Sequence, residues 1–159
     1  MRYFYDTEFI DNGYTLELIS IGVVAEDGRE YYGISTEFNP NQACKWVHKN
    51  VLSKLPSPYS QLWRSKKQIR LELEEFFNVS SSNSIELWAW ISGYDHVVLC
   101  QLWGSMTDVP SAIPSFTHEL RQLWEDSGLT LLPAKPEDKH NALTDARYNL
   151  KCFLTMTKL

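Results

Sequence analysis

Apolar and polar residues alternate along much of the first forty positions, which is the pattern of half-buried β-strands. Strand-like segments cover residues 2–10, 15–25 and 30–38. An Asp-Asn-Gly sequence at 11–13 separates the first two, and the Asp-Gly pair at 27–28 favours a tight hairpin between the second and third. The chain is therefore predicted to open with an antiparallel meander of strands.

The rest of the chain alternates between helical and strand-like patterns. Ser65 has capping-box spacing to Gln68, and apolar residues then follow at the helical period as far as Phe77. A polar tract at 80–84 is expected to end that helix. One strand is expected at 85–91, and the other expected helices cover residues 42–52, 94–103, 116–126 and 141–157. This order predicts one α/β domain over residues 1–159, with a mixed sheet covered by helices.

The bulk composition is that of an ordinary soluble globular protein. Of the 159 residues, 43% are hydrophobic and 22% are charged. No apolar run approaches the ~18 residues that a membrane-spanning helix needs, and we expect no signal peptide, because a strand-like segment opens the sequence. Cys44, Cys100 and Cys152 match no metal or redox spacing, which favours a reducing compartment. We therefore expect a cytoplasmic protein with no membrane partner.

Asp6 and Glu8 stand in an otherwise aromatic and apolar run within the first predicted strand. Residues two apart on a strand point to the same face, so both carboxylates would project together beside an apolar core. Such a pair repels itself and resists loss of solvent, and a divalent cation is the usual group that offsets the charge. The pair is therefore a candidate metal site.

Two later segments carry further candidates. Asp95 begins a helix directly after a strand, where the sites of open α/β sheets gather, although an Asp there also favours the helix dipole alone. His140 and Asp145 can cooperate only if His140 precedes the last helix and Asp145 lies inside it. An exposed histidine and a helix-surface aspartate are the alternative. Ala142 is small enough to let another element approach closely.

Together these residues resemble the DEDDh family of 3′–5′ exonucleases, the DnaQ-like branch of the ribonuclease H-like fold. The resemblance rests on Asp-Thr-Glu at 6–8, Asp95 after a later strand, and the His-x-Ala-x-x-Asp sequence at 140–145. Within that family, the segments 1–10, 84–90 and 120–126 look closest to the adenylate-preferring bacterial exoribonucleases of the RNase AS type.

The resemblance implies an enzyme that releases nucleoside 5′-monophosphates from RNA 3′ ends with two Mg²⁺ or Mn²⁺ ions. Asp6 would bridge the ions, Glu8 and Asp145 would bind the ion that activates water, and Asp95 would support the ion at the departing oxygen. His140 would take a proton from the attacking water, because an imidazole can gain and lose protons near neutral pH.

The implied partner is a single-stranded, adenylate-rich RNA 3′ end, and the implied assembly is a homodimer. Trp63 and Trp103 are expected at the surface, where either could serve a dimer contact.

Many DnaQ-like enzymes have an Asn four or five residues before the middle Asp, where this chain has Ile91 and Trp90. Its substrate contacts must therefore differ, and the candidates are Thr7, Phe9 and Trp90, with a core role as the alternative.

The net charge of −5 by itself argues against a nucleic-acid partner. Adding the four positive charges of two divalent ions leaves about −1, so the overall charge decides little. The carboxylates address phosphate and metal rather than the sugar, so a 3′–5′ DNA exonuclease remains an alternative. A catalytically silent nucleic-acid-binding module is disfavoured, because all five positions carry the required residue types.

Overall fold

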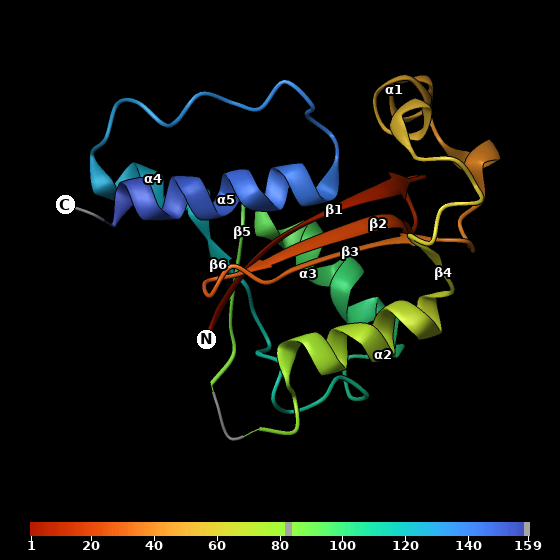
Figure 1. Cartoon of the computed structure of the whole chain (residues 1–159), viewed down its shortest axis with the longest axis horizontal. Coiled ribbons are helices and arrows are strands. Elements are labelled where there is room, and N and C mark those ends of the chain that lie inside the picture. Colours follow the sequence, from red (N-terminus) through yellow and green to blue (C-terminus); the bar gives the residue numbers. More distant parts are fainter. Residues whose placement is uncertain (82–83, 158–159) are drawn as a thin grey trace.

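A six-stranded sheet with helices on both faces forms the framework of the computed structural model, which describes residues 1–81 and 84–157 (Figure 1). The strands are β1 (Arg2–Asp11), β2 (Leu16–Ala25), β3 (Glu30–Ser35), β4 (Trp63–Arg64), β5 (Glu86–Ala89) and β6 (His118–Glu119). The helices are α1 (Lys45–Asn50), α2 (Lys66–Phe77), α3 (Ser92–Cys100), α4 (Leu120–Ser127) and α5 (Ala142–Met156), with short 3₁₀ turns η1 (Pro40–Gln42), η2 (Leu52–Lys54) and η3 (Gln101–Trp103).

The strand order is β4-β3-β2-β1-β5-β6. β1, β2 and β3 form the predicted antiparallel meander, whereas β4, β5 and β6 each pair in parallel with a neighbour. This mixed sheet covered by helices confirms the predicted α/β class and is compatible with a ribonuclease H-like fold.

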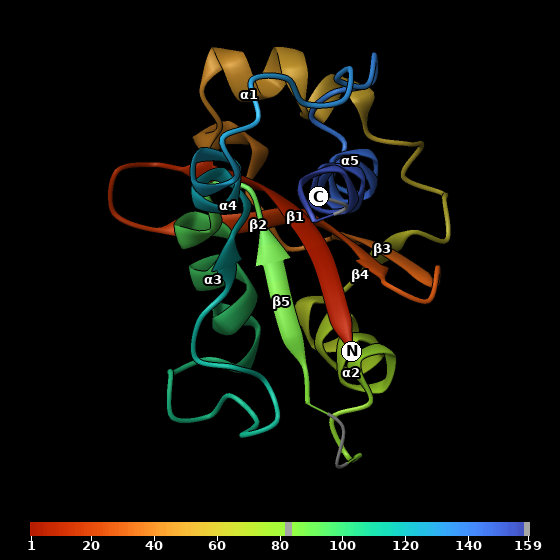
Figure 2. The same cartoon turned by 90° about the vertical axis from the view of Figure 1, so that its left-hand side faces the viewer.

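β1 lies inside the sheet, and both of its faces are covered. Tyr3 and Tyr5 are buried in the cluster that includes side chains of α2 and α3, whereas Phe4 is buried against Phe153 of α5. Figures 1 and 2 show α5 on one face of the sheet and α2 and α3 on the other. Because side chains alternate along a strand, Asp6 continues the series of Phe4 and points to the α5 face.

The first turn of α5 lies very close to β2. Gly22 is the direct partner of Asp6 across the β1–β2 pair. A Cβ atom at Gly22 would overlap the backbone of Ala142 and Leu143. Ala142 itself is fully buried, so its small side chain permits the close approach that the sequence predicted. The absence of any side chain at Gly22 thus allows the start of α5 to lie beside Asp6.

A second contact holds α5 to β1. The Asn149 side chain is buried, and its Nδ2 donates a hydrogen bond of 3.0 Å to the backbone oxygen of Tyr5. Since Tyr5 directly precedes Asp6, this bond fixes the position of the helix along the strand. The contacts at Gly22 and Asn149 therefore determine where the α5 side chains meet the carboxylates of β1.

The prediction of a helix at 116–126 is wrong for its first residues. Residues His118–Glu119 form β6, and α4 begins only at Leu120. The His118 ring stacks on Trp88 of β5 at 4.5 Å, and the Glu119 carboxylate accepts hydrogen bonds from the backbone N–H groups of Ile91 and Ser92 at 2.8 and 2.7 Å. These long-range contacts outweigh the local helical pattern.

Several predicted boundaries also move. The helix expected at 42–52 is divided into α1 and η2, the strand expected at 30–38 ends at Ser35, and the strand expected at 85–91 ends at Ala89. α3 begins at Ser92 rather than at residue 94, because Glu119 binds the amides before its first turn. Residues 82 and 83 of the predicted polar tract lie outside the described residues.

Trp103 is not at the surface as expected. It is 8% exposed, and its indole N–H donates a hydrogen bond of 2.7 Å to Glu74. Trp63 is half-buried and stacks on Phe38. Trp103 is therefore unsuited to a dimer contact.

Cys44, Cys100 and Cys152 are all free thiols. Within the part of the chain that the structure describes, no helix is both long enough and apolar enough to cross a bilayer.

Replacing Gly22 with Ala should destabilise the protein by about 1–3 kcal/mol, because the added methyl group must displace the α5 backbone. Urea unfolding measures this change. Gly93→Ala is the matched control, since Gly93 lies in α3 with open space around it and should tolerate Ala or gain up to about 1 kcal/mol. Equal stability of the two variants would show that α5 does not depend on the close approach.

Candidate functional site

All eight site residues predicted from the sequence line one cavity of about 370 Å³. They come from β1, from the junction of β5 with α3, and from the residues around the start of α5. These residues are Asp6, Thr7, Glu8, Phe9, Trp90, Asp95, His140 and Asp145. Three stretches that lie far apart in the sequence therefore converge on one hollow.

Asp6 and Glu8 lie together at this cavity and resist ionisation. Burial raises the pKa of Asp6 well above its ordinary value, and the charges of Asp95, Glu8 and Asp145 raise it further. Burial and the charges of Asp145 and Asp95 likewise raise the pKa of Glu8 to about 8, and the Lys54 ammonium opposes this shift. Without a cation, Glu8 therefore holds its proton at neutral pH, and Asp6 resists ionisation beside it.

Asp95 is fastened to the strand that carries the pair. It lies in the first turn of α3 and is 6% exposed. Its Oδ1 accepts hydrogen bonds from the Thr7 backbone N–H at 2.8 Å and from the Thr7 hydroxyl at 2.6 Å. Burial raises the pKa of Asp95 to about 6, although the bonds from Thr7 act in the opposite direction. The Thr7 hydroxyl, a predicted substrate contact, here serves to position Asp95.

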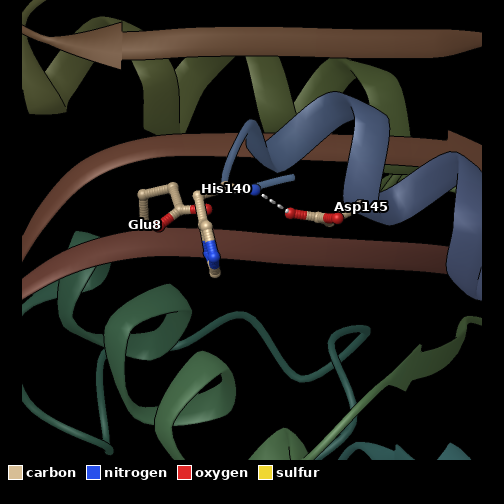
Figure 3. Close-up of side chains that lie close together, drawn as sticks. All are labelled: Glu8, His140 and Asp145. Carbon is tan, nitrogen blue, oxygen red and sulfur yellow. Dashed lines mark hydrogen bonds between the residues drawn. The ribbon is translucent and has the colours of Figure 1, made fainter. Parts of the chain in front are cut away.

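His140 and Asp145 have the relationship that their spacing required. α5 begins at Ala142 with Asn141 as its N-cap, so His140 lies before the helix and Asp145 lies in its first turn. The His140 backbone adopts a positive φ of 64°, and its N–H donates to Asp145 Oδ2 at 2.8 Å. Figure 3 shows this bond and the Glu8 side chain beside it.

A cluster of three possible metal ligands forms here, because atoms of Glu8, His140 and Asp145 lie within 4.8 Å of one another. Burial raises the pKa of Asp145, while the bond from the His140 N–H opposes the shift. In residues 1–81 and 84–157, no salt bridge to Lys or Arg neutralises the four site carboxylates. Oxygen donors that lack a protein cation fit a hard divalent ion such as Mg²⁺ or Mn²⁺.

The walls of the cavity differ in character. On one wall, the rings of Phe9 and Tyr94 stack at 5.9 Å with an angle of 17° between their planes, and Tyr94 is 53% exposed. Lys135 and Lys139 line the cavity from the segment before α5. A stacked aromatic pair suits a nucleobase, and lysines suit phosphate.

Sequence reasoning missed several lining residues. Tyr148 and Asn149 lie three and four positions after Asp145 on the same helix face, so the helical period could have found both. No signal in the sequence places Lys135 and Lys139, since they occur in a segment without regular structure.

The model of the family described as the 3′-5′ exoribonuclease Rv2179c-like domain matches residues 1–157. The chain belongs to this family. Two curated relatives, named 3′-5′ exoribonuclease Rv2179c and 3′-5′ exoribonuclease MT2234.1, come from the H37Rv and CDC 1551 strains of Mycobacterium tuberculosis. Each is 64% identical over 157 residues, which cover 99% of this chain and 94% of the relative.

The raised pKa of Glu8 predicts how this Rv2179c-like domain responds to pH without metal. Folded Glu8 keeps its proton up to about pH 8, whereas the unfolded side chain ionises near 4.5. The folded state binds more protons in this window, so the free energy of unfolding falls as pH rises through it. In chelator at pH 8.5, Glu8→Gln should therefore be more stable than the parent by roughly 1–3 kcal/mol.

The difference should shrink at pH 5, where Glu8 is protonated in the folded parent protein. Denaturant unfolding at both pH values measures it. Glu75→Gln, which changes an exposed glutamate of α2, is the control and should follow the parent at both values. A pH-independent effect of Glu8→Gln would contradict the assigned protonation.

Proposed function

We propose that the chain is a metal-dependent 3′–5′ exoribonuclease of the DEDDh type. The observation that carries the proposal is the convergence of Asp6, Glu8, Asp95, His140 and Asp145 on one cavity. The printed names of the family and of its two relatives support RNA as the substrate and the 3′ end as the starting point. A DNA exonuclease remains the alternative that the experiment below distinguishes.

The carboxylates of Asp6, Glu8, Asp95 and Asp145 would hold two Mg²⁺ or Mn²⁺ ions. A pair of bound divalent ions stabilises the charge that develops on the attacking and departing oxygens of an in-line displacement. The protein contributes the rest by orienting the ligands. Thr7 holds Asp95, and the His140 N–H holds Asp145.

His140 is the proposed general base. As the water oxygen forms a bond to the terminal phosphorus, His140 takes a proton from that water. The bond between phosphorus and the 3′ oxygen of the preceding nucleotide breaks, and the departing oxygen takes a proton from solvent. The products are a nucleoside 5′-monophosphate and an RNA one nucleotide shorter, with a free 3′-hydroxyl.

The cavity walls supply the proposed substrate contacts. Phe9 and Tyr94 offer a stacked pair of rings for a terminal base, and Trp90 lines the same cavity while its ring lies 5.9 Å from that of Trp124. Preference for adenylate rests on the resemblance to RNase AS-type enzymes. A homodimer and a cytoplasmic location also stay predictions, and the free cysteines agree with the latter.

The experiment that tests this function uses 5′-labelled homopolymeric oligomers of each base, as RNA and as matched DNA, with Mg²⁺. We expect a ladder of RNA products that retain the label, together with nucleoside 5′-monophosphates identified by chromatography. Adenylate RNA should be shortened fastest, and DNA should persist. Early loss of the label as a mononucleotide would reverse the direction, and equal shortening of DNA would favour the alternative.

Asp6→Ala and Asp145→Ala should each abolish hydrolysis while the protein stays folded. Each change removes a ligand, and each also relieves repulsion within the buried carboxylate cluster. Asp126→Ala is the matched control, since that aspartate is exposed on α4 outside the cavity. Circular dichroism monitors folding, and mononucleotide release monitors activity. Retained turnover in either site variant would refute the assignment.

His140→Ala should slow hydrolysis by ~10²–10⁴-fold, the usual contribution of a general base. The four carboxylates remain, so Mg²⁺ binding measured by calorimetry should stay close to that of the parent protein. A normal single-turnover rate would remove His140 from the chemistry. Loss of Mg²⁺ binding would instead make it a ligand, which its position near Glu8 and Asp145 permits.

A further inference from the structure

Residues of α1 and η2, far from His140 in the sequence, contact the loop that carries His140. Lys54, in η2, donates a hydrogen bond from Nζ to the backbone oxygen of Lys139. The same Nζ lies 3.7 Å from Asp138 Oδ1. Trp46, in α1, lies against the His140 ring, with centroids 4.7 Å apart and an interplanar angle of 79°. Figure 1 shows α1 beside the end of the molecule where α5 begins.

These contacts matter because few others restrain the ring. In the described parts of the chain, 1–81 and 84–157, no hydrogen bond reaches the His140 imidazole. The peptide group that joins Lys139 to His140 is held at both of its polar atoms: its N–H donates to Asp145, and its carbonyl accepts from Lys54. Trp46 then limits the directions that the ring can take. The backbone directly before the His140 ring is thus fixed by two hydrogen bonds, and the ring itself is restrained by Trp46.

We propose that Lys54 and Trp46 are positioning residues that hold His140 over the carboxylate site from α1 and η2. This inference rests on the proposed function, because it assigns a role through the general base. The ammonium fixes the peptide that precedes His140, and the indole fixes the plane of the imidazole. A base displaced by about 1 Å can lose on the order of 10²-fold in rate, so such contacts affect turnover directly.

The competing role for Lys54 is a phosphate contact. Its Nζ already faces two oxygens of the loop, the Lys139 carbonyl and the Asp138 carboxylate, which favours a structural use of the charge. The two roles differ in what they alter. A phosphate contact changes RNA affinity, and the effect of the ammonium on the Glu8 pKa changes the carboxylate site, whether or not His140 is present. A positioning contact changes the rate only through His140.

The test is a double-mutant cycle in single-turnover hydrolysis of adenylate RNA, with the enzyme in excess and its concentration varied to give both the maximal rate and KM. Lys54→Ala should lower the rate about 10- to 100-fold and leave KM near its parent value. In a His140→Ala background, the same change should have no further effect, because residues that act as a unit are not additive. Lys54→Arg keeps the charge and the donor and should restore much of the rate.

Lys49→Ala is the matched control, since Lys49 belongs to α1 and is exposed. It should leave the rate unchanged. An undiminished effect of Lys54→Ala in the His140→Ala background would overturn the positioning role, as would a change confined to KM.

A second measurement does not depend on activity. Of the four histidine imidazole signals in NMR spectra, the one that disappears in His140→Ala identifies His140. Trp46→Ala and Lys54→Ala should each shift that signal and leave those of His96 and His118 in place. An unmoved His140 signal would overturn the proposal. A moved signal combined with a normal rate for His140→Ala would instead refute the general-base assignment, so the two failures are distinguishable.

Discussion

Repulsion within a cluster of four buried or half-buried carboxylates is the constraint around which this molecule is organised. Burial raises the pKa of each, and the charges of Asp95 and Asp145 raise the pKa values of Asp6 and Glu8 further. A protein that only maximised its stability would pair these groups with Lys or Arg or replace them. Here they remain unpaired by such residues across the described chain, so the fold stores an unfavourable interaction that a bound cation would relieve.

Backbone packing and hydrogen bonds, rather than ion pairs, bring the carboxylates together. The alternation of side chains along β1 points Asp6 toward α5. Because Gly22 has no side chain, the first turn of that helix can come close to the sheet. On the opposite face of β1, Thr7 holds Asp95 with its backbone N–H and its hydroxyl. The position of the site residues therefore depends on the register of β1 and α5 rather than on ion pairs.

Much of this arrangement followed from local patterns. The period of two in the first strand placed Asp6 and Glu8 on one face, and the five-residue separation of His140 from Asp145 required a helix boundary between them. Ser65 capped its helix as predicted, accepting a bond from the Gln68 N–H. Such features depend on neighbours in the sequence, which a pattern records directly.

The unpredicted features depend on distant partners. β6 forms because the His118 ring stacks on Trp88 and the Glu119 carboxylate binds the amides of Ile91 and Ser92 at the start of α3. No pattern near residue 118 predicts either contact. Trp103 is buried because its ring packs in the core cluster that contains residues of α2, and Glu74 of that helix accepts the indole N–H. The hold of Lys54 on the loop before His140 spans 85 residues, so no local period could reveal it.

The carboxylate of Glu119 has a consequence for how an anion can approach. The amino end of a helix commonly attracts phosphate, because its first amides are free and its dipole is positive. At α3, the Glu119 oxygens already occupy the amides of Ile91 and Ser92. Glu119 thus occupies the anion-binding position at the amino end of α3. The phosphates of an incoming polyanion must therefore interact with positively charged groups elsewhere around the cavity.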